Sequence, residues 1–350
     1  MEKALCTDGR TNLKTLNNRA LTEFIADLGE PAYRARQVWQ WLWQKGAAEF
    51  SQMTNLSKPL REKLEQRSWI GNLKIVTRQQ SLQDGTTKYL FKLTDGETIE
   101  SVLMRHNYGL SVCVSTQVGC RMGCGFCAST TEGMVRNLEA WEIYDQVVRA
   151  QEDAGSRVSS VVIMGMGEPL DNYAQVLEFI RLINHAEGLN IGQRHITLST
   201  CGVVPKINDL ALENLDITLS ISLHATTDQV RNEIMPINRK YPIAVLLQAC
   251  GAYIATTKRR ITFEYAIMSG VNDSSEEAHN LGRLLKGLLC HVNLIPVNPV
   301  EGKGFAKPSL EKVRAFQKVV ESYGMETTVR RELGTDIDAA CGQLRRRLAT

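Results

Sequence analysis

The chain has 350 residues, of which 43% are hydrophobic and 23% charged, and this balance fits an ordinary soluble globular enzyme with an ample core. No apolar run approaches the roughly 18–20 residues that a transmembrane helix needs, and residues 1–16 lack the cationic start and apolar stretch of a secretory signal. Because both patterns are missing, we expect a cytoplasmic protein without membrane contact. The net charge of +3 is too small to identify a partner.

The nine cysteines are not expected to build a disulfide scaffold. In a reducing compartment, cysteines are more often buried small hydrophobes, metal ligands or catalytic thiols. Short basic runs at 258–260, 330–331 and 345–347 could contact phosphate groups, although most such runs are solvated surface.

About the first hundred residues differ in pattern from the rest. Helical periodicity covers 17–29, 33–46 and about 56–66, and a hairpin follows, with turns at Asp84-Gly85 and Asp95-Gly96. The tryptophans of the second helical stretch could stack on nucleic-acid bases, but aromatic residues at helical spacing are more often part of a core. We expect residues 1–95 to form a small accessory domain of helices and a hairpin.

Strand and helix patterns alternate from about residue 97 onward. Strands are expected at 110–117, 159–164, 194–200, 217–223, 260–268, 291–297 and 326–332. Helices of fitting length are expected at 138–153, 173–187, 203–213, 227–256 with a break at Pro236, 275–289 and 309–323. Because parallel neighbours need a crossover connection, this alternation indicates an α/β fold with a parallel sheet. Residues 96–350 are predicted to form a partial (β/α)6 TIM-type barrel, with a doubly wound sheet as the alternative.

Small and polar residues follow the predicted strands, at the ends where such folds place their functional groups. The loop GCRMGCGFCAS follows the first strand, GMGEP follows the second, and three later strands end in Ser-Thr-Cys-Gly, Ser-Leu-His and Asn. Chance would scatter such residues, so five strand ends of this kind predict one site. Its candidate residues are Cys120, Cys124, Cys127, Gly167, Glu168, Ser199, Ser222, Leu223, His224 and Asn298.

Three of these candidates are cysteines within eight residues, Cys120, Cys124 and Cys127. Thiolates are soft ligands that suit zinc or iron–sulfur centres. A structural zinc site would need a fourth ligand at short spacing, and neither His nor Cys follows nearby. Three ligands on a four-iron cluster leave one iron open to bind another molecule, which is a catalytic arrangement.

The pattern Cys-x3-Cys-x-Phe-Cys at 120–127 resembles the signature of the radical S-adenosylmethionine (SAM) superfamily. The resemblance implies a 4Fe–4S cluster whose open iron chelates the amino and carboxylate groups of SAM. An electron from the cluster then cleaves SAM to a 5′-deoxyadenosyl radical. GMGEP is similar to the superfamily motif that contacts the SAM amino group, although an ordinary strand-to-helix turn would also use glycine and proline.

Further motifs narrow the resemblance to the RlmN/Cfr family of adenosine methyltransferases. They are CVSTQVGCRMGCGFCAST, VVIMGMGEPLDNY, SLHA, MPINR, CHVNLIPVNP and DIDAACGQLR in the core, with YRARQVWQWLWQKG and MTNLSK in the accessory region. The resemblance implies methylation of adenine C2 in 23S rRNA at the peptidyl transferase centre, with the adenosine beside the tRNA anticodon as a second substrate. It also implies that residues 1–95 contact RNA.

The resemblance assigns roles to three more residues. Cys341, in DAACGQLR, matches the family's methyl carrier, and Cys113, in SVCVS, matches the cysteine that later resolves the enzyme–RNA adduct through a transient disulfide. Glu100 matches the glutamate that takes the adenine proton. Two SAM molecules are consumed, because one methylates Cys341 and the other supplies the radical. From sequence alone, a cysteine in this Ala- and Gly-rich tail would be taken as a small buried residue.

The family pattern also implies SAM contacts and partners. The SAM contacts are Gly167, Glu168, Ser199, Ser222, Leu223, His224 and Asn298. The expected partners are 23S rRNA, tRNA, an electron donor such as flavodoxin or ferredoxin, and a thiol reductant for the Cys113–Cys341 disulfide. We expect a monomer.

Two other functions remain open at this stage. A Cfr-type enzyme would use the same machinery to methylate adenine C8 and so confer antibiotic resistance, although the cysteine loop and the tail look more like RlmN. An RNA-binding protein with a purely structural metal site would produce no 5′-deoxyadenosine from SAM.

Overall fold

The computed structural model describes residues 9–344, and its centre is one ten-stranded sheet in the order β14-β13-β12-β11-β10-β9-β6-β5-β4-β3. Its parallel strands are β6 (Gly109–Cys113), β9 (Val158–Ile163), β10 (Ile196–Thr200), β11 (Thr218–Ser222), β12 (Ile261–Ile267), β13 (Cys290–Pro296) and β14 (Glu326–Val329). These strands neighbour one another in chain order, so every crossover runs the same way. A doubly wound sheet would reverse its order, and the predicted partial barrel is therefore confirmed.

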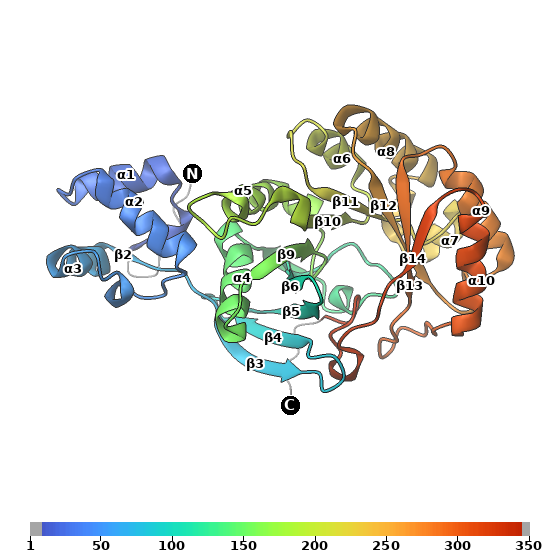
Figure 1. Ribbon diagram of the computed structural model, residues 1–350, viewed down its shortest axis with the longest axis horizontal. Helices are drawn as coiled ribbons and strands as arrows, with labels where there is room; N and C mark the ends of the chain where they lie inside the picture. Colours follow the sequence, from blue (N-terminus) through green and yellow to red (C-terminus); the bar gives the residue numbers. More distant parts are fainter. Residues whose placement is uncertain (1–8, 345–350) are drawn as a thin grey trace.

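Helices cover the outside of the curved sheet (Figure 1). They are α4 (Ala140–Ala154), α5 (Tyr173–Asn184), α6 (Val204–Leu210), α7 (Asp228–Ile234), α8 (Ile243–Thr257), α9 (Ser275–Leu285) and α10 (Leu310–Glu321). The side chains of Ser274 and Ser309 cap α9 and α10 by accepting a backbone N–H of the first turn. The break expected at Pro236 is present, because a short 3₁₀ turn, η7 (Pro236–Arg239), separates α7 from α8. No helix within 9–344 is long and apolar enough to cross a lipid bilayer.

The N-terminal region is a small helical unit at one end of the molecule (Figure 1). It comprises β1 (Thr11–Asn12), η1 (Leu13–Thr15), α1 (Asn18–Asp27), α2 (Tyr33–Trp39), the π-helical turn η2 (Gln40–Gln44), η3 (Phe50–Gln52), α3 (Lys58–Arg67) and β2 (Ser68–Trp69). Trp39 and Trp43 are buried, and the two rings pack 5.5 Å apart. The interpretation as core residues is confirmed for these two, whereas Trp41 is only half-buried and its indole N–H donates to Asn55.

A buried ion pair joins this unit to the barrel. The Lys14 ammonium lies 2.7 Å from the Asp145 carboxylate of α4, and both side chains are fully buried. The other oxygen of Asp145 accepts a hydrogen bond from the backbone N–H of Leu73. Breaking a buried pair by removing one partner leaves an uncompensated charge, so this contact fixes the unit against α4.

The antiparallel strands β3 (Lys74–Gln80), β4 (Thr87–Lys92) and β5 (Thr98–His106) extend the central sheet. The sequence grouped the β3–β4 hairpin with the accessory helices, whereas its backbone pairs with β5, which in turn pairs with β6. A domain boundary at residue 95 stays a prediction. Through β5, the hairpin is joined to β6 and is therefore part of the same sheet as the barrel strands.

Candidate active site

The predicted site residues lie at the carboxyl ends of the parallel strands. Cys113 is the last residue of β6, Ser222 is the last of β11, and Asn298 follows β13. Because these strands are parallel and neighbours in order, their carboxyl ends form one rim. The structure thus brings together residues that are far apart in sequence.

The cysteine loop, residues 120–127, is framed by a small antiparallel pair, β7 (Gln117–Gly119) and β8 (Met134–Asn137). Gly119 has a φ of +78°, and a Cβ there would lie 1.8 Å from the Gly133 carbonyl oxygen. The backbone N–H of Cys120 donates to that same carbonyl at 3.1 Å. Only glycine at position 119 permits this close approach, which shapes the entry to the loop.

The three thiols of the cysteine loop are largely withdrawn from water. Burial raises the pKa of Cys120 to about 12, and burial followed by mutual repulsion among the thiols raises the pKa of Cys124. The pKa of Cys127 is raised chiefly by burial as well. Such thiols stay protonated unless a nearby positive charge, such as a metal centre, stabilises the thiolates.

The cysteine loop fits an iron–sulfur cluster better than a single ion. Within residues 9–344, no three His, Cys, Asp or Glu side chains converge on a position that could hold one metal ion. Each thiolate of a cluster binds a different iron, so three soft donors on one glycine-rich loop suit it. Cys120, Cys124 and Cys127 are the residues that would hold it.

The GMGEP loop packs against the segment between β6 and β7. Gly167 has a φ of +104°, and a Cβ there would lie 2.6 Å from the Cβ of Gln117. The backbone N–H of Glu168 donates to the side-chain oxygen of Gln117 at 2.9 Å. The Glu168 carboxylate accepts from the backbone N–H groups of Leu170 and Cys201, at 3.0 and 2.8 Å. Hydrogen bonds to neighbouring segments therefore fix this loop in place, unlike a simple surface turn.

His224 sits in a strained, buried position after β11. Its φ is +57°, and its ring packs edge-on against Phe126 of the cysteine loop at 5.0 Å. Nδ1 accepts a hydrogen bond from the backbone N–H of Ala266 at 2.9 Å, so the ring proton is assigned to Nε2. Burial, followed by the nearby Arg231, lowers the pKa of His224 to about 3. His224 is thus a neutral side chain held beside the loop.

The candidate cysteine pair lies across the barrel mouth. Cys113 is buried and Cys341 is exposed, and each is a free thiol. Burial raises the pKa of Cys113 to about 12, and the neighbouring Cys341 adds to the increase. The Arg330 guanidinium acts in the opposite direction on Cys113, and it also faces Cys341 and Glu264. The structure therefore places one cation beside both cysteines.

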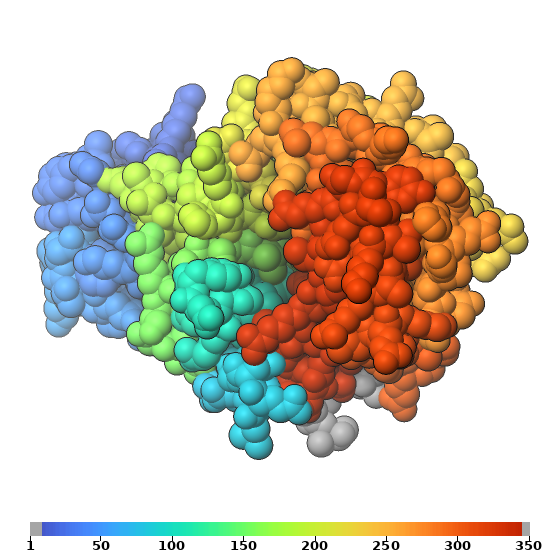
Figure 2. Space-filling view, turned by 45° about the vertical axis from the view of Figure 1, so that its right-hand side comes forward, coloured from blue at the N-terminus to red at the C-terminus, as the bar shows by residue number. Residues whose placement is uncertain are grey.

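Residues 334–344, which we call the carrier segment, lie beside the β3–β4 hairpin (Figure 2) and are bonded to residues just after the cysteine loop. On the hairpin side, the Asp84 carboxylate accepts from the backbone N–H of Gly334 at 2.9 Å. The ammonium of Lys88 donates to the Asp338 carbonyl at 3.4 Å. The hairpin turn and strand β4 thus hold the first half of the carrier segment.

The second half of the carrier segment is bonded to the cluster side of the mouth. The backbone N–H of Ala128 donates to the Gly342 carbonyl at 2.7 Å, and the Asn298 amide donates to the Cys341 carbonyl at 3.3 Å. The hydroxyl of Ser129 donates to the Leu344 carbonyl at 2.8 Å. Backbone and side-chain hydrogen bonds on both sides of Cys341 in the sequence therefore hold it at the barrel mouth.

Glu100 is a buried carboxylate on β5, not a surface charge at a strand edge. Its side chain is about 5% exposed and lies 3.6 Å from the ammonium of Lys88. Since Lys88 also reaches Asp338, one lysine joins Glu100 to the carrier segment.

Two family models match the chain. Residues 11–70 match the ribosomal RNA large subunit methyltransferase N-terminal domain, and residues 114–282 match the radical SAM superfamily. Proteins called "Probable dual-specificity RNA methyltransferase RlmN" are similar to nearly the whole chain. One from Desulforamulus reducens is 57% identical over 97% of each chain, and one from Clostridium perfringens is 53% identical over 96% of each.

The chain belongs to the RlmN family of radical SAM methyltransferases. A crystal structure of a radical SAM methyltransferase from Sphaerobacter thermophilus superimposes with a TM-score of 0.92 at 45% identity, covering 96% of this chain and 99% of that one. The family, the fold and the enzyme class predicted from sequence are confirmed. The roles of individual site residues stay predictions.

Arg330 and Lys88 were missed as members of the RlmN-type site. The sequence grouped Arg330 with Arg331 as a basic run, but both residues follow the end of β14 at Val329, and the backbone N–H of Arg330 still donates to the Leu294 carbonyl of β13. Arg330 accordingly faces the two cysteines, whereas Arg331 is exposed. No local pattern marks Lys88, because only the sheet pairing and the carrier segment give it its neighbours.

The other basic runs lie away from the mouth or outside the described residues. Arg259 donates to the Ile217 carbonyl just before β11, and Arg260 pairs with Glu326 at the start of β14. Both sit at the amino ends of the strands, opposite the RlmN-type site. The run at 345–347 lies outside the described residues.

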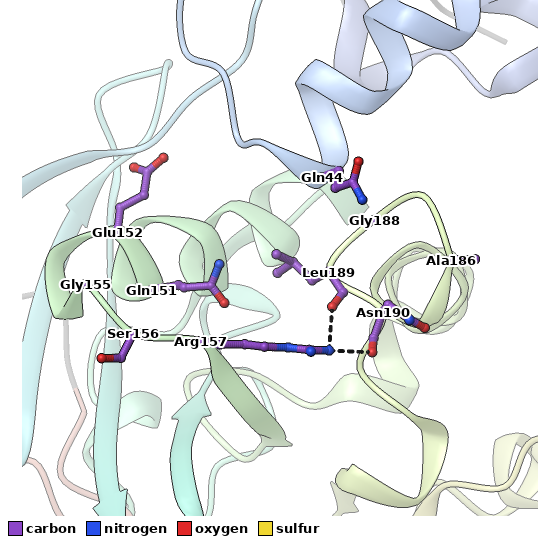
Figure 3. A pocket seen from close by; sticks show the side chains of 10 residues that line it. All are labelled: Gln44, Gln151, Glu152, Gly155, Ser156, Arg157, Ala186, Gly188, Leu189 and Asn190. Carbon is purple, nitrogen blue, oxygen red and sulfur yellow. Dashed lines mark hydrogen bonds between the residues drawn. The ribbon is translucent and has the colours of Figure 1, made fainter.

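One pocket of about 540 Å³ also lies away from the site (Figure 3). It opens between η2, the connection from α4 to β9, and the loop after α5, at the amino ends of the strands. Arg157 crosses it and donates to the carbonyls of Leu189 and Asn190. No residue expected in the RlmN-type chemistry lines this pocket, so it is not the candidate active site.

Proposed function

We propose that this enzyme methylates C2 of an adenosine in 23S rRNA, at the peptidyl transferase centre, and of the adenosine beside the anticodon in tRNA. The observation that carries the proposal is the meeting of two free cysteines, Cys113 and Cys341, with the cysteine loop at one barrel mouth. Adenine C2 is electrophilic, so a simple attack on the SAM methyl group has no nucleophile. A methylated protein cysteine provides a carbon that a radical route can deliver.

Cys120, Cys124 and Cys127 would hold a 4Fe–4S cluster that, with SAM at its open iron, supplies the one-electron chemistry for hydrogen abstraction. Gly167 and Glu168, with Ser199, Ser222, Leu223, His224 and Asn298, would line the SAM position on the rim. Since Glu168 and His224 already make hydrogen bonds to the backbone, both are held in fixed orientations before SAM arrives.

Cys341 is the methyl carrier in this scheme. Its sulfur gains the methyl group from a first SAM while the sulfonium C–S bond breaks. The second SAM serves hydrogen abstraction from that methyl group, so two SAM molecules are used per product. The carbon on Cys341 then joins adenine C2, the radical adduct would return one electron to the cluster, and Glu100 accepts the C2 proton.

Cys113 ends the cycle by attacking the sulfur of Cys341. The S–S bond forms, the bond from sulfur to the transferred carbon breaks, and its electron pair stays on that carbon, which takes a proton to become methyl. A thiol reductant then restores both thiols. A flavodoxin or ferredoxin would supply the electron, the helical unit within residues 1–95 would contact RNA, and a cytoplasmic monomer is the expected form.

The test is anaerobic reconstitution with rRNA fragments, tRNA and methyl-labelled SAM. Cys341→Ala should abolish label transfer to RNA while reductive cleavage of SAM continues, and Cys113→Ala should accumulate a covalent RNA–protein adduct on a denaturing gel. Cys290→Ala is the matched control, because that cysteine lies at the opposite end of β13. RNA methylation by Cys341→Ala would contradict the carrier role.

Mass spectrometry of the modified nucleoside decides the position of the methyl group. Label on adenine C2 supports the proposal, and label on C8 would make this a Cfr-type enzyme. Reduced protein that yields no 5′-deoxyadenosine from SAM would instead leave an RNA-binding protein with a structural metal site.

A further inference from the structure

Arg231 is a completely buried cation whose hydrogen bonds end on neutral oxygen atoms. It lies in α7 and is 0% exposed. Its Nε donates to the Leu223 carbonyl at 3.0 Å, and Nη2 donates to the carbonyls of Cys201 and Ser222 at 2.8 and 3.0 Å. Nη1 donates to the side-chain oxygen of Asn238 at 2.9 Å. A buried charge held only by dipoles needs an explanation.

The position of Arg231 lies next to the cysteine loop. The carbonyl of Ile234, at the end of α7, accepts the backbone N–H of Gly125 at 2.8 Å. Ile234 also packs in one apolar cluster with Cys124 and Cys201. The guanidinium is bonded to the carbonyl of Cys201, which packs in that same cluster with Cys124. Helix α7 therefore carries a positive charge to the cluster side of the loop.

The nearby carboxylate is engaged elsewhere. Asp228 lies one turn before Arg231, and its Oδ1 accepts from the side chain of Asn238 and the backbone N–H of Ile243, both at 2.9 Å. Asp228 therefore makes no hydrogen bond to the guanidinium and offsets its charge only through space, and the Arg231 hydrogen bonds go instead to the strand-end carbonyls and Asn238. A cluster bound by three thiolates is negative, and it gains a further negative charge on reduction.

We propose that Arg231 is the fixed counter-charge of the cluster, favouring its reduced state while it sets the carboxyl ends of β10 and β11 for SAM. The second role follows from its hydrogen bonds to the carbonyls of Cys201, Ser222 and Leu223, which join two strand ends. Arg231 acts through these groups and through its field, so it is a positioning residue. The inference rests on the proposed cluster and not on the C2 outcome.

The charge effect and the hydrogen-bond effect can be separated by two substitutions. Arg231→Gln removes the charge, and Arg231→Lys keeps the charge while losing the fork of donors. Arg259→Gln is the matched control, because Arg259 binds the Ile217 carbonyl at the opposite end of β11. The measurements are the midpoint potential of the reconstituted cluster, followed by electron paramagnetic resonance without RNA, the SAM dissociation constant, and the melting temperature of the apoprotein.

Arg231→Gln should make reduction at least about tenfold less favourable, which is 59 mV for a one-electron couple. Arg231→Lys should keep the potential but lower the melting temperature and weaken SAM binding. An unchanged potential in a loaded Arg231→Gln protein, or the same shift in both variants, would overturn the counter-charge. If the Gln variant holds no cluster, Asp228→Asn decides: a positive shift supports the inference, and no shift overturns it. Absence of a cluster in the unsubstituted protein would instead refute the proposed function.

Discussion

The cysteine loop and the carrier segment meet at the barrel mouth, but they are held in opposite ways. The loop has buried or half-buried thiols, and its backbone bonds directly to neighbouring backbone at Gly133 and Ile234. The carrier segment presents an exposed Cys341 and depends on side chains such as Asp84, Lys88 and Asn298 for many of its contacts. A radical source must be shielded, whereas Cys341, if it carries the methyl group as proposed, has to reach SAM, RNA and Cys113 in turn. Exchangeable polar contacts suit that second task.

Among the substitutions, removal of a cluster ligand is expected to cause the largest loss of activity. Cys124→Ala should leave the protein folded but reduce its iron content, its yield of 5′-deoxyadenosine and its RNA methylation to background, because two thiolates cannot retain the cluster. Iron analysis and nucleoside chromatography after anaerobic reconstitution measure this, with Cys290→Ala run in parallel. Full iron loading in the Cys124 variant would show that the loop does not hold the metal.

The next largest effect is expected in the pH dependence of the alkylation rate of Cys113. Burial favours its neutral thiol, so the thiolate fraction is small near neutrality and should rise about tenfold per pH unit until the pKa near 12 is approached. Alkylation of Cys113 should therefore speed up about 100-fold from pH 7 to pH 9, as followed by peptide mass spectrometry. In denaturant the ordinary pKa near 9 applies, and alkylation should be faster throughout.

Arg330→Met tests the cation beside Cys113. Loss of the cation should raise the pKa further and slow alkylation of the folded protein, whereas Arg331→Met should not. Equal rates for Cys113 in folded and unfolded protein would contradict the buried environment of the cysteine pair.

A smaller effect is expected at the hairpin turn that holds the carrier segment. Asp84→Ala removes the acceptor for the Gly334 N–H, a contact worth about 1 kcal/mol, so the ratio of docked to undocked carrier segment should fall about fivefold and the methylation kcat should fall by up to that factor. Reductive cleavage of SAM should be nearly unchanged. Asp95→Ala is the matched control, because Asp95 lies in the next Asp-Gly turn and pairs with Arg136 instead. Equal losses in the two variants would mean that the turn matters only for stability.

The smallest effect is expected at Lys88. Lys88→Met leaves Glu100 buried without this cation and removes one bond to the carrier segment, so RNA methylation should fall about two- to threefold. Lys92→Met, at the exposed end of the same strand, is the control. Single-turnover kinetics should place the loss after methylation of Cys341; a loss in that first methyl transfer would count against the link to Glu100.

Sequence predicted the parts of the molecule whose structure depends on local pattern. The strands, the break at Pro236 and the cysteine loop follow from periodicity, proline chemistry and short spacing. The sequence did not predict which distant segments pack together. A hairpin pattern does not state which sheet it joins, so the β3–β4 pair was grouped with the helices. The neighbours of Cys341 depend on contacts such as Asp84 with Gly334, which are 250 residues apart.

During translation, the cysteine loop is synthesised before the carrier segment that contacts its C-terminal side. Ser129, which follows the cysteine loop, and Leu344, to which it is bonded, are separated by 215 residues. At the usual 5–20 residues per second, the ribosome needs roughly ten to forty seconds to bridge that interval. The cysteine loop therefore emerges well before the carrier segment can dock. During that interval the contacts of residues 334–344 with Ala128 and Ser129 are absent, so this side of the cysteine loop is open to an incoming cluster.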